Sequence, residues 1–350
     1  MMFDHFSPPA PAPRRRLATL VDVTLRDGGF EVDFHWPLEM FAAVPQALGP
    51  VGVDIVEIGY IGGVPLEHGV GTPGLGAHLT CAMVAGAAGT GPDLAAMIHP
   101  TALRGEIDLP AYRAAGLAMV RLVYHPDWSE EITRIAGRAR DAGLQVTVNI
   151  ALASRYDPGD LVDHARRICQ GAAPDVLYVA DTCGAFTPDR TRRTCAALRD
   201  QVAVPVGFHA HDFQTLAYAN TLAAVEEGAC YVDCSVLGLG RGGGNLQTEI
   251  MLANHRLSDD IPLGALQALV RWRTVLGQLA RRPLPDLVAL ACGALNLTPV
   301  EEASLRTFAD QQGIAAAEAA LWVMAVYPQV GSLRAEDLAA AWSRSMAGVR

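Results

Sequence analysis

Two histidines separated by a single residue, His209 and His211, are the first candidates for chemistry in this sequence. On an extended strand, side chains two positions apart project to the same face, so both imidazoles can bind one cation. Asp27 adds a carboxylate, and two imidazoles with one carboxylate leave several positions of an octahedral ion free for substrate and water. The sequence therefore predicts a divalent metal site, with Mn²⁺ as the expected ion and Mg²⁺, Co²⁺ or Zn²⁺ as alternatives.

The neighbouring polar residues favour this interpretation over a pair of ordinary polar histidines at a strand end. Arg26, beside Asp27, presents a positive fork that would stabilise a developing oxyanion, as an enolate-forming reaction requires. The alternative is an ion pair between Arg26 and Glu57, and both roles are compatible because a carboxylate can orient the guanidinium. Asn245, which ends the run GLGRGGGN, either completes the metal shell through its side-chain carbonyl or caps a helix.

Short apolar runs that alternate with helical patterns must position these side chains. Their near-continuous Val/Ile/Leu composition is typical of parallel strands that are covered on both faces. The repeated strand–helix alternation predicts an α/β fold, a closed (β/α)8 TIM barrel with its active site at the C-terminal ends of the strands. The predicted strands are Leu17–Leu25, Val53–Gly59, Leu94–His99, Met119–Tyr124, Gln145–Ala151, Val176–Asp181, Val204–His209 and Cys230–Val236.

Further polar residues follow the ends of these strands. Tyr60, His99 and His125 stand at the ends of the second, third and fourth predicted strands. We therefore expect all three near the metal set, as candidates for proton transfer during catalysis.

Helices are expected between the strands, at Glu130–Ala142, Pro188–Arg199 and Phe213–Glu227. The glycine-rich stretch Gly69–Gly91 is irregular for one helix. It predicts a long loop over the barrel mouth, with a weak helix near Leu79–Ala87.

After about Asn254 the pattern is helical through Trp342, with several prolines between the helical segments. The apolar segments Leu263–Leu279 and Ala315–Met324 favour a homo-oligomer, with a dimer as the simplest form. The predicted organisation is a flexible N-terminal tail over residues 1–16, a catalytic barrel over residues 17–257 and a C-terminal helical appendage over residues 258–350.

Composition narrows the class of protein. The 350 residues carry a formal net charge of −10, which offers no positive footprint for nucleic acid or an anionic membrane. No segment approaches the 18 or so apolar residues of a membrane helix. The seven cysteines form no CxxC pair, which favours reduced thiols in the cytoplasm. We expect a small-molecule substrate and a cytoplasmic enzyme.

Four motifs together resemble one superfamily. They are TLRDGG at Thr24–Gly29, VEIG at Val56–Gly59, HAHD at His209–Asp212 and GLGRGGGN at Gly238–Asn245. In order and spacing they resemble the DRE-TIM metallolyases, the superfamily of 3-hydroxy-3-methylglutaryl-CoA (HMG-CoA) lyase, the 4-hydroxy-2-oxoacid aldolases and the isopropylmalate and homocitrate synthases.

The resemblance implies roles for individual residues. The name-giving Asp, Arg and Glu of the superfamily fall on Asp27, Arg26 and Glu57. The implied metal ligands are Asp27, His209 and His211, with Asn245 as a fourth, and the implied chemistry is a metal-bound 2-oxo acid that passes through its enolate. Within the superfamily, the segment AGLAMVRLVYH and the short helical tail look most like the 4-hydroxy-2-oxovalerate aldolase branch, and the cysteine-bearing glycine loop of HMG-CoA lyases is missing.

Two positions depart from the aldolase pattern. The aldolases carry an acid/base histidine shortly after the strand 1 aspartate, where this sequence has Phe30. Their C-terminal catalytic tyrosine has no obvious counterpart in residues 291–305. Another group must then move the proton, and the candidates are Glu31, His35, Tyr60, His99 and His125.

The leading hypothesis is a lyase of the aldolase type that cleaves or forms the C3–C4 bond of a 4-hydroxy-2-oxo acid. The first alternative is a Claisen-type condensation of an acyl-CoA with a 2-oxo acid, as in isopropylmalate and homocitrate synthases, which needs the same metal. The second alternative is a non-catalytic barrel subunit, suggested by the missing histidine and tyrosine.

Overall fold

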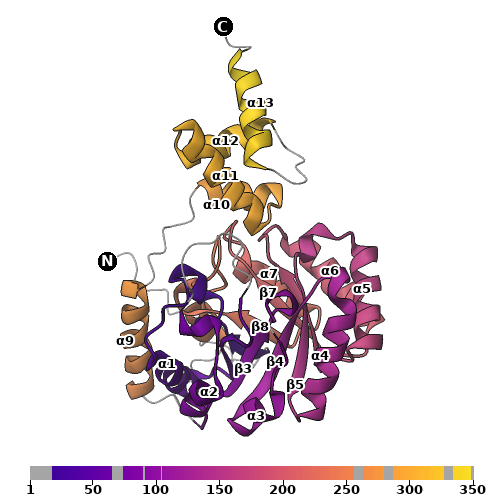
Figure 1. Ribbon diagram of the computed structural model, residues 1–350, viewed down its shortest axis with the longest axis vertical. Coiled ribbons are helices and arrows are strands. Elements are labelled where there is room, and N and C mark those ends of the chain that lie inside the picture. The colour runs from indigo at the N-terminus through magenta and orange to yellow at the C-terminus, as the bar shows by residue number, and fades with distance from the viewer. Residues whose placement is uncertain are drawn as a thin grey trace, which may run out of the picture.

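The computed structural model describes residues 18–64, 74–89, 91–103, 105–255, 263–279, 287–326 and 334–347, so the predicted tail over residues 1–16 lies outside the described residues. Eight parallel strands close into a barrel in chain order (Figure 1). This architecture confirms the predicted (β/α)8 fold. The strands are β1 Thr19–Asp22, β2 Ile55–Tyr60, β3 Asp93–Ile98, β4 Leu117–Tyr124, β5 Gln145–Ile150, β6 Val176–Asp181, β7 Val206–Ala210 and β8 Tyr231–Cys234.

The barrel interior changes from apolar to charged along the strands. Alternate residues of a strand face the same side, so those of one parity point inward. Val21, Ile55 and Met119 belong to one apolar cluster at the start of the strands. Two residues further along β2 and β4, Glu57 and Arg121 meet in an ion pair across the interior. The charged layer therefore lies toward the C-terminal ends of the strands, where a barrel places its active site.

Helices cover the outer face of the barrel, and their apolar sides pack against the strands in one large core. No helix within the described ranges combines the length and the apolar character needed to cross a membrane. The helices that follow the strands are α1 Met40–Leu48, α2 Cys81–Ala87, α3 Leu109–Ala114, α4 Ser129–Asp141, α5 Pro158–Gly171, α6 Pro188–Gln201, α7 Ala217–Glu226 and α8 Thr248–His255.

The predicted helices between the strands are present, with one shifted start. Helices α4 and α6 match their predicted ranges closely. Helix α7 begins at Ala217 instead of Phe213, because the Asp212 carboxylate accepts a hydrogen bond from the Ala217 N–H (2.9 Å) and holds the intervening residues in a turn. The weak helix expected near Leu79–Ala87 is α2, while residues 69–73 and 90 of the predicted loop lie outside the described residues.

The C-terminal helices occupy two places on the barrel. Helix α9 (Leu263–Leu279) lies along the side of the barrel next to α1, and its Leu269 and Leu276 join the barrel core (Figure 1). Helices α10 (Leu287–Leu295), α11 (Pro299–Gln312), α12 (Ala316–Val326) and α13 (Ala335–Ala347) build a second core above the barrel. The domain boundary after residue 257 stays a prediction.

Specific contacts join this second core to the barrel. Phe213, from the segment between β7 and α7, is part of the apolar cluster of the C-terminal helices. The Ser154 hydroxyl donates to the Asn296 side-chain carbonyl (2.6 Å), and Arg155 forms an ion pair with Glu301 of α11. Because these contacts involve segments after β5 and β7, the C-terminal helices cover part of the barrel mouth.

Candidate metal centre

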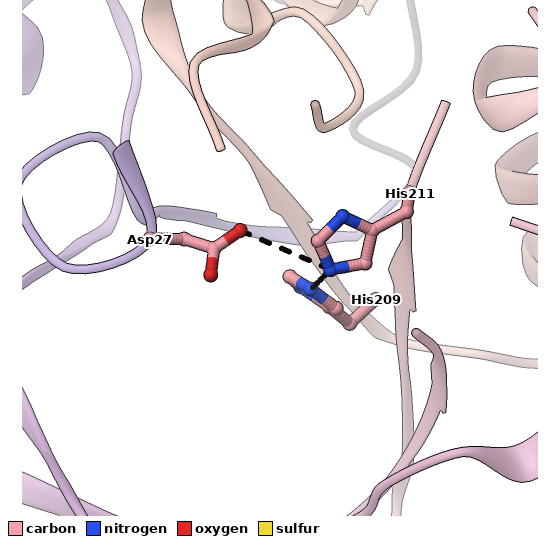
Figure 2. A group of neighbouring side chains, drawn as sticks. All are labelled: Asp27, His209 and His211. Carbon is pink, nitrogen blue, oxygen red and sulfur yellow. Dashed lines mark hydrogen bonds and ion pairs between the residues drawn. The ribbon is translucent and has the colours of Figure 1, made fainter. Parts of the chain in front are cut away.

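Asp27, His209 and His211 come together at the barrel mouth, as Figure 2 shows. Asp27 follows β1, in a turn closed by its N–H donating to the Val23 carbonyl (2.8 Å). His209 lies within β7, and His211 directly follows that strand in an isolated bridge with Asn245. All three side chains are buried. The period-two argument for the His-x-His pair therefore agrees with their position on one side of β7.

The three side chains fit a divalent cation. The Nε2 atoms of His209 and His211 are 3.2 Å apart, and Asp27 Oδ2 is 3.9 Å from His211 Nε2 (Figure 2). Ligand atoms that each lie about 2.1 Å from one ion are separated by about 3 to 4 Å. Two imidazoles and a carboxylate suit Mn²⁺ and its neighbours in the first transition series. This donor set does not select one of these ions over the others.

The electrostatics keep His211 and Asp27 in the ionisation states that bind metal. Burial lowers the pKa of His211 to about 3, so its ring is neutral at pH 7. Burial alone would raise the pKa of Asp27, but the charge of Arg26 outweighs it and holds the pKa well below its ordinary value. The site therefore presents a neutral imidazole and a carboxylate, as metal binding requires.

A buried chain of ion pairs orients these ligands from behind. Arg26 Nε donates to Glu57 Oε2 (2.7 Å), so the predicted ion pair is present, and Arg26 Nη1 donates to Asp27 Oδ1 (2.6 Å). Arg121 is fully buried and donates to Glu57 Oε2 (3.0 Å) and to Asp233 Oδ2 (2.6 Å). The chain thus runs across the barrel interior, from the residues after β1 through β2 and β4 to β8.

Asp233 ends the chain of ion pairs at His209, one of the candidate metal ligands. Its Oδ2 lies 2.9 Å from His209 Nδ1, and since a carboxylate only accepts, the hydrogen is on Nδ1. The lone pair of His209 Nε2 is then directed toward His211 and Asp27. Such a carboxylate behind a histidine fixes the ring tautomer and raises its basicity as a ligand.

Asn245 contacts the site through its amide. Its Nδ2 donates to Asp27 Oδ2 (2.7 Å) and to the Leu239 carbonyl (2.9 Å), while its buried Oδ1 has no hydrogen-bond partner among the described residues. Helix α8 begins at Thr248, so the alternative of Asn245 as a helix cap is wrong. Asn245 orients Asp27, and its carbonyl oxygen stays a candidate ligand.

The three candidate metal ligands lie in the wall of a cavity of about 280 Å³. Arg26 and the three candidate ligands form part of this wall, as do Tyr60, His99 and His125. Burial raises the pKa of Tyr60 to about 12, so its hydroxyl remains a proton donor at pH 7. The structure thus brings every predicted catalytic side chain except Glu57 to the cavity, and Glu57 stands behind Arg26.

His99 and His125 share one aromatic neighbour at the cavity, Trp128. Their ring centroids lie 4.9 and 5.2 Å from the Trp128 ring. His99 Nδ1 is 2.9 Å from Thr101 Oγ1, a contact that fixes the imidazole plane. His125 Nδ1 accepts a hydrogen bond from the Asp127 N–H (3.3 Å).

Phe30, an apolar residue, occupies the position at which the aldolases carry their acid/base histidine. Phe30 faces the cavity and packs edge-to-face on Phe34 (5.0 Å) and Tyr60 (6.4 Å). His35 lines a separate surface hollow instead, and Glu31 is not in the wall of the central cavity. These two alternatives for the proton-transfer group are therefore less well placed than His99 and His125.

Several wall residues were not among the sequence candidates. Arg241 enters from the glycine-rich loop, Asn149 from β5, and Thr298 with Pro299 and Val300 from the start of α11. No tyrosine is present in this last segment, in agreement with the departure noted in the sequence. The signal that could have identified the buried partners is a charge inside a Val/Leu-rich strand, as at Arg121 and Asp233, because a buried charge requires a partner.

The fold and site together define a TIM barrel with a candidate divalent-metal centre at the C-terminal ends of its strands. Comparison with known families gives the same class: the model of the HMGL-like family matches residues 119–271. A 4-hydroxy-2-oxovalerate aldolase of Brevibacillus brevis is 34% identical over 239 residues, which cover 67% of this chain and 68% of the relative. The chain belongs to the HMGL-like family, and the superfamily predicted from the four motifs is confirmed.

A further relative and two solved structures are also similar to this chain. The 4-hydroxy-2-oxovalerate aldolase 2 of Nocardia farcinica is 32% identical over 250 residues, 68% of either chain. Among solved structures, the N-terminal domain of a putative aldolase from Bacteroides vulgatus superposes with a TM-score of 0.70 at 23% identity, covering 84% of this chain and 98% of that one. The carboxyl transferase domain of Rhizobium etli pyruvate carboxylase gives 0.62 at 16% identity, over 86% and 54%. The two structural similarities support the fold alone.

Proposed function

We propose that this protein is a divalent-metal-dependent carbon–carbon lyase of the aldolase type that acts on a 4-hydroxy-2-oxo acid through an enolate. One observation carries the proposal: the Nε2 atoms of His209 and His211 and the Asp27 carboxylate converge beside Arg26 in the wall of a cavity. The relatives named as 4-hydroxy-2-oxovalerate aldolases support the reaction class.

Asp27, His209 and His211 would hold the cation, with the Asn245 carbonyl as a fourth candidate, and Mn²⁺ is the expected ion. When bound, the cation supplies a Lewis acid that polarises the C2 carbonyl and stabilises negative charge on its oxygen. Arg26 shares this task, because two of its guanidinium nitrogens are fixed by Glu57 and Asp27. Within the described residues its third nitrogen, Nη2, has no hydrogen-bond partner, and it can donate to the oxyanion.

Cleavage needs a base at the 4-hydroxyl. As that proton leaves, the C3–C4 bond breaks, its electron pair moves through C3 to the C2 oxygen, and the C4 fragment departs as an aldehyde. Return of a proton to C3 completes pyruvate. We assign the proton at the 4-hydroxyl to His99, because it borders the cavity and its ring is held by Thr101. Phe30 has no group that could accept it.

The experiment is pyruvate release from 4-hydroxy-2-oxopentanoate, with and without Mn²⁺, by the purified full-length chain. Asp27→Asn keeps the shape of the ligand but removes its charge, and kcat/KM should fall by at least about 100-fold. Unchanged turnover in this variant, or after complete metal removal, would contradict the proposed metal role. Thiol release from acetyl-CoA in the presence of a 2-oxo acid would instead support the Claisen-type condensation.

The base is tested separately. His99→Gln should lower kcat by about 100-fold or more, because the glutamine amide cannot accept the proton of the 4-hydroxyl. His125→Gln is the matched control, since His125 borders the same cavity and contacts the same Trp128. A loss confined to His125→Gln would move the role to His125, and normal turnover in both variants would reject histidine as the base.

A further inference from the structure

A pair of polar side chains, Thr147 and Asn149, stands inside the barrel on β5. The two residues are two positions apart, so their side chains point to the same side of the strand. The Thr147 hydroxyl donates to Asn149 Oδ1 (3.1 Å), and Asn149 forms part of the cavity wall with only 5% of its surface exposed. Because the amide oxygen accepts this hydrogen bond, the amide nitrogen lies on the other side of the group, away from Thr147.

The amide nitrogen of Asn149 is a donor that the fold leaves to the cavity. Within the described ranges Nδ2 makes no hydrogen bond, yet it is not among the polar atoms that are shut off from solvent without a partner, so the cavity reaches it. Its neighbours in the wall, Val123 on β4 and Ala151 on β5, have no side-chain acceptor. A donor buried against carbon atoms costs about 1 to 3 kcal/mol, whereas a ligand oxygen at this place satisfies it.

Strand register brings Asn149 level with His99, the residue to which the proton of the 4-hydroxyl is assigned. Strands β3 and β4 are paired up to Ile98 and Leu122, so the next residues, His99 and Val123, lie side by side. Val123 is in turn paired with Asn149 of β5. His99 and Asn149 thus lie at one height with a single strand between them, and their backbones are about 10 Å apart. Both line the cavity, so an oxygen atom between them is within reach of both side chains.

This part of the wall faces the metal candidates. In the closed barrel β5 is four strands away from β1 in either direction, so Asn149 lies across the interior from Asp27, which follows β1. The proposed function puts the C2 oxygen of the 2-oxo acid beside Arg26 and the metal candidates. The C4 end of the substrate then extends toward β3, β4 and β5. The oxygen on C4 is therefore the substrate atom that Asn149 can reach.

We propose that Asn149 is a catalytic residue, whose Nδ2 donates a hydrogen bond to the oxygen on C4 of the substrate. The inference rests on the proposed function, because that reaction requires an oxygen on C4. During cleavage His99 removes the hydroxyl proton, the O–H electron pair forms the C4–O double bond, and the C3–C4 pair moves through C3 to the C2 oxygen. The C4 oxygen carries most negative charge after the proton has left and before the C3–C4 bond has broken. A donor already in place stabilises it at that stage.

The test separates the two ends of the substrate. Exchange of the C3 hydrogens of pyruvate with D2O, measured by mass spectrometry, needs stabilisation of charge on the C2 oxygen but involves no atom on C4. Cleavage of 4-hydroxy-2-oxopentanoate needs both ends. Both reactions are measured on the full-length chain with Mn²⁺.

Two substitutions of similar size remove the donor. Asn149→Leu removes the whole amide, while Asn149→Asp keeps an oxygen that accepts from Thr147 but has no N–H, since a carboxylate only accepts. In both variants kcat for cleavage should fall by at least about 10-fold, as expected for the loss of one donor to a developing oxyanion. Proton exchange of pyruvate should fall by less than about threefold. Thermal unfolding of each variant, followed by circular dichroism, checks that the fold is intact.

The outcomes separate this inference from the proposed function. A fall in cleavage of less than about threefold in Asn149→Leu would overturn the role of Asn149. An equal loss of cleavage and exchange would also overturn it, because Asn149 would then support the whole site and not the C4 oxygen. The proposed function is judged on the wild type alone: if the wild type shows no Mn²⁺-dependent cleavage of the 4-hydroxy acid, the lyase proposal fails, and this inference fails with it.

Discussion

Replacement of Arg121 by methionine tests whether the buried chain of ion pairs supports the fold. Arg121 is fully buried and joins Glu57 to Asp233, and its guanidinium carbon also lies 4.5 Å from the centre of the Tyr178 ring. Methionine fills most of the space of the aliphatic stem but brings no charge. The buried chain would then hold three carboxylates against Arg26 alone.

The expected loss is large. Removal of one partner from a buried ion pair costs about 3 to 5 kcal/mol, because the remaining charge stays buried without compensation. Domains are stable by only about 5 to 15 kcal/mol, so Arg121→Met would lose a large part of the free energy of unfolding. The exposed pair of Arg134 with Glu131 provides the control, and Arg134→Met should cost about 1 kcal/mol or less.

The double variant Arg121→Met/Asp233→Asn separates charge from packing. It removes one charge of each sign, and the Asp233→Asn amide oxygen can still accept from His209 Nδ1. Since neutral replacement of a whole buried pair is often tolerated, the double variant should regain at least about 2 kcal/mol over Arg121→Met.

Urea denaturation in the presence of chelator, followed by circular dichroism, measures all four proteins, and the slopes of the transitions should agree within error. The reasoning is refuted if Arg121→Met loses less than about 1 kcal/mol, or if the double variant is no more stable than the single one.

Three other predictions follow from buried contacts. Gly240→Ala should weaken Mn²⁺ binding by at least about 10-fold in a calorimetric titration, because the added methyl group would displace Asp27 and Asn245. An unchanged affinity would show that the loop moves to make room for the methyl group and leaves the ligands in place. Saturating Mn²⁺ at about 100 times its dissociation constant should stabilise the wild type by about 2.7 kcal/mol, and the same addition should leave the melting temperature of Asp27→Asn nearly unchanged. Burial raises the pKa of Asp22 from 3.8 to about 6, so the folded state keeps a proton that the unfolded state has lost, and stability falls as pH rises through that window. Relative to wild type, Asp22→Asn should therefore gain about 3 kcal/mol between about pH 3.5 and about pH 7 in urea titrations, and a constant difference between the two proteins would contradict the shift.

The strand order and the convergence of the three candidate ligands were accessible from the sequence because both depend on local patterns. Apolar runs define the strands, and the closed barrel then brings their C-terminal ends to one place. The His-x-His spacing needs only a period of two, which is why the sequence alone pairs His209 with His211. Asn245 was predicted from the sequence as a candidate ligand, but its amide contact with Asp27 depends on the path of the loop.

Other parts of the site depend on contacts between distant segments. Arg121 and Asp233 lie 112 positions apart, and nothing in either strand alone names the other as its partner. The position of Thr298 at the cavity depends on how the C-terminal helices dock on the barrel. Arg241 was visible only as part of a glycine-rich run, whose composition says that the loop is tight and not where its one long side chain is directed.

The charge of the buried chain links metal binding to stability. With Asp27, Glu57 and Asp233 against Arg26 and Arg121, the interior keeps one negative charge away from water, which is costly for an isolated group. A divalent cation at the candidate ligands offsets that charge only in the folded state, where the ligands converge. Arg121→Met enlarges the negative surplus, so this variant should gain at least as much stability from Mn²⁺ as the wild type does, even though it is far less stable without it. If Mn²⁺ instead stabilised the variant much less than the wild type, Arg121 would have to act by holding the ligands in place, through Asp233 and His209, more than through its charge.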